Sequence, residues 1–266
     1  MEHENKFDKI KQKPNLAVVG CSYSHYADGN CLFKSYPAYI AENFPDWNVV
    51  DLSSPGSSND SAYLRLFNFE HNYKIKFDKV IFQITHFDRL IYFNRYSNLD
   101  QNLWTHVVKN NYFYTENDGQ FYENSYLTMS STIGLPDRPP GNWNEYRRKK
   151  ISKWIGLKEK YIVKCIMGEF LSNKSIWHCQ KEINLINATY GSNNVLVYSW
   201  HKGIDKGKNL KSEIFFPKNW KKSMEERLTT DKFWKLSIDD AGHFDDIGHL
   251  EAYKALEPDI KNLIKG

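Results

Sequence analysis

The stretch Leu16-Ala17-Val18-Val19-Gly20-Cys21-Ser22-Tyr23-Ser24 decides the fold of this chain. Four consecutive apolar residues are typical of a strand that is buried on both faces, and Gly20 ends this strand in a tight turn. Strands of this kind belong to parallel sheets that are covered by helices. The stretch therefore predicts an α/β fold, and it places the hydroxyl of Ser22 on a turn at the end of a strand.

Apolar runs and helical patterns alternate along the rest of the chain. We expect further strands at residues 47–52, 79–84, 194–200 and, as a short one, 233–236. Helical spacing predicts helices at residues 32–44 (or from Pro37), from about residue 59, twice within 143–190, and at 249–264. The prediction is one domain over residues 1–266, a three-layer α/β/α sandwich with a parallel sheet in a flavodoxin-like plan. A loop-rich insertion is expected at residues 91–141, as a lid over the site or as a decoration.

Composition limits the classes of function. The formal net charge is +4, from 36 basic and 32 acidic residues, which lacks the excess that nucleic-acid binding usually shows. The basic run at residues 147–150 is either the solvated start of a helix or a site for an acidic group. The 15% of aromatic residues serve either packing or a surface that faces sugars.

Location is also read from composition. The first 13 residues lack the apolar segment of a secretory signal, and no apolar run reaches the length of a membrane span. The four cysteines have no metal-ligand spacing. We therefore expect a cytoplasmic protein with free thiols, no membrane partner, no metal and no cofactor.

Three residues follow strands at the same predicted edge of the sheet: Ser22, Gly56 and Thr85. Ligands of parallel α/β sheets bind beyond the carboxyl ends of the strands, so this edge is the candidate site. The loop at residues 54–58 could instead cradle a phosphate at a helix N-terminus, but it lacks the glycine patterns of such loops.

A second motif, Asp240-Ala241-Gly242-His243, lies just before the last predicted helix. A serine, a histidine that takes its proton and a carboxylate that orients the histidine are the parts of nucleophilic catalysis. Asp246 and His249 have the same spacing, and we prefer Asp240 and His243 because His249 falls at the start of the helix. A thiol nucleophile at Cys21 is the minor alternative.

These motifs resemble those of the SGNH hydrolases, also called the GDSL esterase/lipase family. Gly20-Cys21-Ser22 is similar to the Gly-Asp-Ser of that family, and the loop around Gly56 is similar to its second motif. Asp240 and His243 match the last motif. Thr85 stands where the family has an asparagine.

The resemblance implies a serine esterase in which Ser22 is the nucleophile, His243 the base and Asp240 its partner. It implies an oxyanion hole of Ser22, Gly56 and Thr85. The residues expected to bind substrate are His86, Arg89 and Asn59. The implied substrate is a small acyl ester, acetyl on a carbohydrate being the first choice. Two alternatives stay open: an O-acyltransferase acting on a glycan, and a binding protein of this fold without turnover. The oligomeric state is open.

Overall fold

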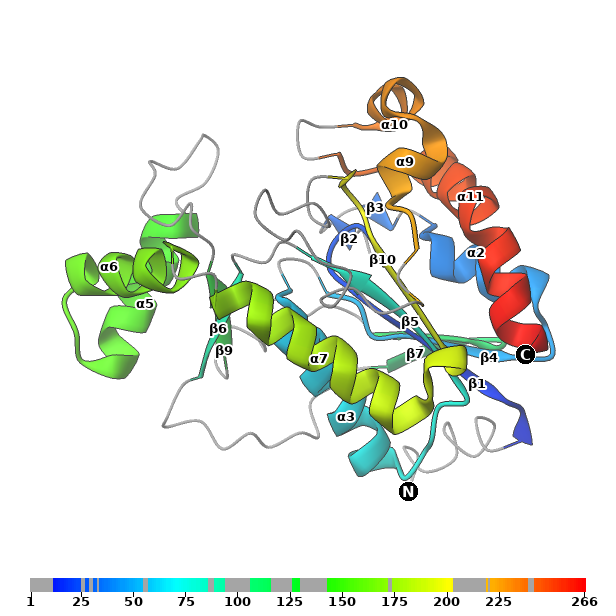
Figure 1. Cartoon of the computed structure of the whole chain (residues 1–266), viewed down its shortest axis with the longest axis horizontal. Helices are drawn as coiled ribbons and strands as arrows, with labels where there is room; N and C mark the ends of the chain where they lie inside the picture. Colours follow the sequence, from blue (N-terminus) through cyan, green and yellow to red (C-terminus); the bar gives the residue numbers. More distant parts are fainter. Residues whose placement is uncertain are drawn as a thin grey trace.

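The computed structural model shows a parallel α/β fold (Figure 1). It describes residues 12–24, 27–28, 31–32, 34–54, 57–85, 89–93, 106–115, 126–129, 143–171, 174–202, 219, 221–238 and 242–266. The central sheet has the order β10-β5-β1-β4-β8-β7. Its strands are β1 (Asn15–Val19), β4 (Asn48–Asp51), β5 (Lys79–Ile84), β10 (Val195–Ser199), β8 (Tyr112–Thr115) and β7 (His106–Lys109).

The four strands expected from apolar runs are confirmed and pair in parallel. Val18 of β1 lies beside Asp51 of β4 on one side and beside Ile81 of β5 on the other. The next strand outward from β5 is β10, where Leu196 pairs with Ile81. Counted along the chain, these strands have the order second-first-third-fourth, the flavodoxin-like plan. The strand order reverses beside β1, so the loops after β1 and β5 flank the usual ligand position of such sheets.

Helices cover both faces of the sheet and complete three layers (Figure 1). One face is packed by Leu66 of α3 (Asn59–Tyr73) and Ile186 of α7 (Lys174–Tyr190). The other face is packed by Ile40 and Leu256. Ile40 belongs to α2 (Tyr36–Asn43) and Leu256 to α11 (Asp246–Lys265). The short helix α9 (Met224–Leu228) packs on the same face. Every residue of β1, β5 and β10 is buried, as the continuous apolar runs predicted.

Part of the segment expected as an insertion belongs to the central sheet. Strand β8 pairs in parallel with β4, and β7 pairs with β8 as an antiparallel hairpin. Asn110 has φ 58° in the turn between them, a conformation that asparagine tolerates. A separate pair is formed by β6 (Leu90–Phe93) and β9 (Tyr126–Met129). The segment therefore widens the sheet as well as decorating it.

Helices α5 (Trp143–Ile155) and α6 (Glu159–Leu171) lie beside β6 and β9 (Figure 1). With α7 they make three helices where two were expected within 143–190, because Gly156 ends α5 with φ 70°. The remaining short elements are β2 (Ala27–Asp28), β3 (Cys31–Leu32) and a 3₁₀ turn, η3 (Ser192–Asn194).

The strand expected at 233–236 is wrong, because these residues belong to helix α10 (Thr230–Leu236). Phe233 is buried while its neighbour Trp234 is 43% exposed, and both environments suit a short amphipathic helix. A run of four such residues fits a strand or a helix equally well. In the described part of the sheet, β10 is the edge strand on this side.

Candidate active site

The turn after β1 is locked by a side chain from the neighbouring strand. Gln83 of β5 is fully buried, and its Oε1 accepts hydrogen bonds from the Cys21 N–H at 3.0 Å and the Ser24 hydroxyl at 3.1 Å. A Cβ at Gly20 would lie 2.4 Å from that oxygen, so the close approach requires glycine. The lock leaves Ser22, between these residues, half-buried on a fixed turn.

Ser22 meets the histidine of the second motif. The Ser22 Oγ lies 2.8 Å from His243 Nε2, across 221 positions of sequence. This is hydrogen-bond distance, and a neutral imidazole with a free Nε2 lone pair would accept the serine proton there. The structure thus joins the two ends of the chain at the switch point of the sheet.

The loop that carries His243 is held from three sides. The Trp200 indole N–H donates to the Gly242 carbonyl at 2.9 Å, and the Ile238 N–H donates to the His243 carbonyl at 2.8 Å. Gly242 has φ 84°, and a Cβ there would lie 2.8 Å from the His201 ring, so both conformation and space require glycine. Asp245 caps α11 immediately afterwards by accepting from the Gly248 N–H.

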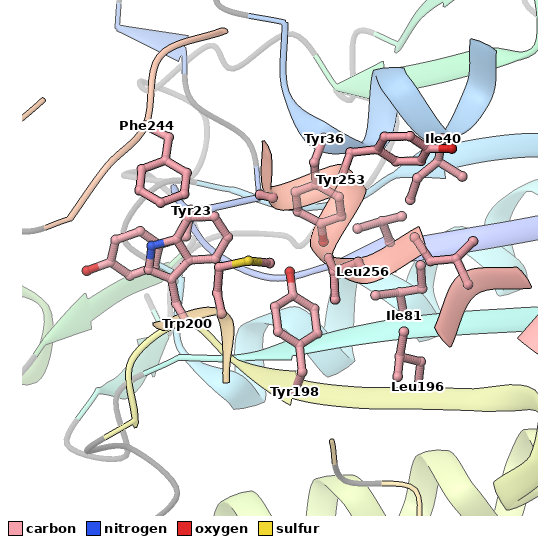
Figure 2. Close-up of a cluster of buried hydrophobic side chains, with 14 of the residues drawn as sticks. Tyr23, Tyr36, Ile40, Ile81, Leu196, Tyr198, Trp200, Phe244, Tyr253 and Leu256 are labelled. Carbon is pink, nitrogen blue, oxygen red and sulfur yellow. The ribbon is translucent and has the colours of Figure 1, made fainter. Parts of the chain in front are cut away.

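One aromatic ring lies against the His243 imidazole and is backed by others. Tyr23 stacks on it with ring centroids 4.8 Å apart, and Tyr23 also stacks on Trp200 at 5.3 Å. Figure 2 shows Tyr23, Trp200 and Phe244 together at one end of the buried cluster that continues to Tyr36 and Tyr198. This setting keeps water away from one side of the imidazole, which strengthens its polar interactions.

The loop between β4 and α3 is clamped to the end of β5. Asn59 accepts from the Thr85 N–H at 2.9 Å and donates to the Thr85 carbonyl at 3.3 Å. Ser58 caps α3 with a capping box to Ser61. The Thr85 hydroxyl is buried and has no hydrogen-bond partner among the described residues. Asn59 therefore holds two loops of the edge together.

A buried arginine ties the same loops to β1. Arg65 of α3 is 2% exposed and donates to the carbonyls of Leu52 and Gly20 and to the hydroxyl of Ser57. No described carboxylate lies within ion-pair distance of it. Sequence reasoning missed this residue, although a single arginine on the apolar face of α3, beside Leu66, is a visible signal.

The other predicted residues have different outcomes. The positions of Asp240, Gly56 and His86 lie outside the described residues. Arg89 is half-buried and donates to the Ser57 carbonyl at 3.2 Å.

Two alternatives to the proposed pair can be compared with the structure. His249 is fully buried in α11 and packs against Tyr36, Trp200 and Phe244, so its environment is that of a core residue. The Cys21 thiol is likewise fully buried beside Gln83 and is poorly placed as a nucleophile. Ser22 and His243 are the pair at the edge of the sheet.

One pKa shift bears on the scaffold of the turn. Burial raises the pKa of the Tyr36 phenol well above its usual range, so the phenol stays neutral and shares a hydrogen bond with Ser24 at 3.1 Å. Within the described ranges, no group of three His, Cys, Asp or Glu side chains is arranged to hold a metal ion. None of the described helices is long and apolar enough to cross a bilayer.

Comparison with known proteins gives one kind of match. No family model matches the chain, and no curated protein matches it. Among solved structures, the crystal structure of TesA aligns with 94% of this chain and 99% of its own, with a TM-score of 0.42 and 11% sequence identity. A likeness of this size indicates nothing about activity or substrate.

Proposed function

We propose that this chain is a serine-dependent acyl hydrolase of the SGNH type. The observation that carries the proposal is the 2.8 Å contact between Ser22 Oγ and His243 Nε2 at the switch point of a parallel sheet. A serine and a histidine within hydrogen-bond distance on a fixed turn are the minimal parts of an activated nucleophile. The motif resemblance supports the same assignment from the sequence.

The chemistry follows from the pair. The Ser22 oxygen attacks the ester carbonyl carbon, and its proton passes to His243 Nε2. As the tetrahedral intermediate collapses, the bond to the leaving alcohol breaks and His243 returns the proton to that alcohol. Water, or the acceptor hydroxyl in a transferase, then attacks the acyl-serine and gives its proton to His243. His243 returns that proton to Ser22 as the bond between the acyl group and Ser22 breaks. Asp240 is assigned to orient His243, on the basis of sequence spacing alone.

The oxyanion would be bound by the N–H groups of Ser22 and Gly56, with the Thr85 hydroxyl as third donor. The buried Thr85 hydroxyl with no described partner supports this role, since its proton is not committed to another described group. Losing one donor of an oxyanion hole typically lowers the rate by about 10²-fold or more. His86 and Arg89 remain proposed substrate contacts. So does Asn59, although its amide already bonds to Thr85.

The proposed substrate is a small acyl ester, acetyl on a carbohydrate first. Transfer to a glycan hydroxyl is the alternative, because the same acyl-serine serves both reactions. Binding without turnover is the outcome expected if Thr85 cannot replace the asparagine of the family.

The test is reaction with a fluorophosphonate probe, followed by hydrolysis of p-nitrophenyl acetate and butyrate. Labelling of the wild type that disappears in Ser22→Ala and falls strongly in His243→Ala is the expected result. Matched controls are Ser192→Ala on η3 and His71→Ala on α3, both exposed, which should label as the wild type does. A folded wild type that neither labels nor hydrolyses would contradict the enzyme and favour the binding protein.

A further inference from the structure

Three polar side chains, those of Glu225, His201 and Tyr23, lie in a row that ends beside His243. The Tyr23 hydroxyl lies 3.2 Å from His201 Nε2, and His201 Nδ1 lies 4.0 Å from Glu225 Oε2. All three side chains are largely buried, with exposed fractions of 15% for the His201 side chain and 6% for that of Glu225.

Glu225 is fixed at its end of this chain. Its backbone N–H donates to the Trp200 carbonyl at 3.0 Å, and its Oε2 accepts from the Lys202 N–H at 3.2 Å. The Lys202 ammonium lies 3.5 Å from Oε1. The carboxylate therefore has a set position from which it faces the His201 ring.

His201 in turn contacts Tyr23 through its other ring nitrogen. In the neutral imidazole an unprotonated Nε2 accepts from the Tyr23 hydroxyl, and a protonated Nε2 donates to the hydroxyl oxygen, so the contact survives either state. The His201 ring also meets Tyr23 edge-on, with centroids 5.3 Å apart. Hydroxyl and ring contacts together hold the Tyr23 ring in one orientation.

Tyr23 in turn contacts the base. Its ring stacks on the His243 imidazole at 4.8 Å with 29° between the planes, and it stacks on Trp200, as Figure 2 shows. Tyr23 is also the residue directly after Ser22. One turn thus supplies the serine and the ring against which its partner lies.

We infer that Tyr23 and His201, with the Glu225 carboxylate 4.0 Å from the far nitrogen of the His201 ring, form a positioning relay that sets the plane of the His243 imidazole against Ser22. None of the three is assigned a proton in the reaction. Their effect on rate rests on the proposed function, because an imidazole held off line transfers the serine proton less well. A displacement of 1 Å in an active site can cost about 10²-fold in rate.

The first experiment is a double-mutant cycle on the rate of fluorophosphonate labelling of Ser22. Tyr23→Phe keeps the ring and removes the hydroxyl, and His201→Ala removes its partner. We expect each to slow labelling about tenfold and the double variant to be no slower than His201→Ala alone, because Tyr23→Phe removes only the hydrogen bond that His201→Ala has already removed along with the ring contact. His201→Gln, whose amide reaches the position of Nε2, should recover to within about threefold of the wild type.

Phe233→Leu is the packing control. Phe233 touches the His201 ring, with centroids 5.3 Å apart, without a hydrogen bond to it. We expect less than about threefold loss in this variant, since only packing changes. A double variant slowed about a hundredfold, a His201→Gln as slow as His201→Ala, or a Phe233→Leu equally slow would overturn the relay.

A measurement without turnover separates the relay from the proposed function. The side-chain ¹⁵N resonances of His201 and His243 are recorded at one pH in the wild type and in Tyr23→Phe. The relay requires both rings to shift. An unchanged His243 would contradict the relay, whereas a wild type that does not label Ser22 contradicts only the proposed function.

Discussion

Replacing Gln83 by methionine should release the turn that carries Ser22. Methionine has nearly the same length as glutamine but accepts no strong hydrogen bond. The buried Cys21 N–H would lose its described acceptor, and the Ser24 hydroxyl would lose one of its two described partners while keeping Tyr36. Gln83 also accepts from the Cys21 thiol at 3.5 Å and donates from Nε2 to the Ile84 carbonyl at 2.8 Å. The change therefore leaves the Cys21 N–H without its described acceptor and removes three further hydrogen bonds.

The main part of the magnitude comes from the two contacts that hold the turn, those of the Cys21 N–H and the Ser24 hydroxyl. A buried donor left unpaired costs about 1–3 kcal/mol, and the net loss of a further hydrogen bond costs about 0.5–1.5 kcal/mol. We expect the free energy of unfolding to fall by about 2–4 kcal/mol, which a domain of ordinary stability survives. Labelling of Ser22 should slow as well, because its neighbouring peptide is no longer held.

Urea unfolding followed by tryptophan fluorescence measures the loss, with the slope m compared between variants. Gln180→Met is the matched control: Gln180 lies partly exposed on α7 and bonds only Asn184 among the described contacts. Such a surface change is usually within ±0.5 kcal/mol, so about that value is expected for the control. A loss in Gln83→Met no larger than in the control would refute the lock.

Three further predictions concern the same edge and the helix layer beside it. Thr85→Val should slow hydrolysis by about 10²-fold if Thr85 is an oxyanion donor, while Thr85→Ser retains most activity; equal rates in both variants would exclude the donor role. Gly20→Ala should lower the free energy of unfolding, measured in urea, by about 1–3 kcal/mol, because its Cβ would lie 2.4 Å from Gln83 Oε1. The control is Gly266→Ala, whose Cβ would have its nearest atom at 3.5 Å. Equal losses in the two variants would contradict the argument. Burial raises the pKa of Glu182 from 4.5 to about 7 in the folded protein. The folded state then binds more protons than the unfolded state between these values, so stability should fall as pH rises from 4.5 to 7, by at most about 1.4 kcal/mol per pH unit. Glu182→Gln should remove that slope in urea unfolding at several pH values, and a slope that persists would reject Glu182 as its source.

The core of the fold could be predicted because its signals are local. The strands β1, β4, β5 and β10 are short apolar runs, and a run buried on both faces needs no knowledge of its partners to be found. The candidate pair was predictable for a different reason: Ser22 and His243 each stand where a strand or loop ends at the edge of the sheet. Their order along the chain, serine near the start and histidine before the last helix, is the order that the SGNH resemblance predicted.

Other features depend on partners that no local pattern reveals. Of the β8 side chains that the structure describes, Phe113 alone is fully buried, and the segment becomes a strand because β4 offers an open edge. The strand-like run at 233–236 forms part of helix α10 because the helix packs Phe233 against Trp200 and Phe244 in the core. The contacts of Tyr23 and Gln83 arise from tertiary packing alone.

The contact between Ser22 and His243 closes only when both ends of the chain are in place. All the described strands of the central sheet precede residue 200, so these strands can be synthesised and paired, with Ser22 already on its turn, before His243 leaves the ribosome. The serine would meet its partner last, once α11 docks on α2. A fluorophosphonate pulse during synthesis would then report the completion of folding rather than the presence of the serine.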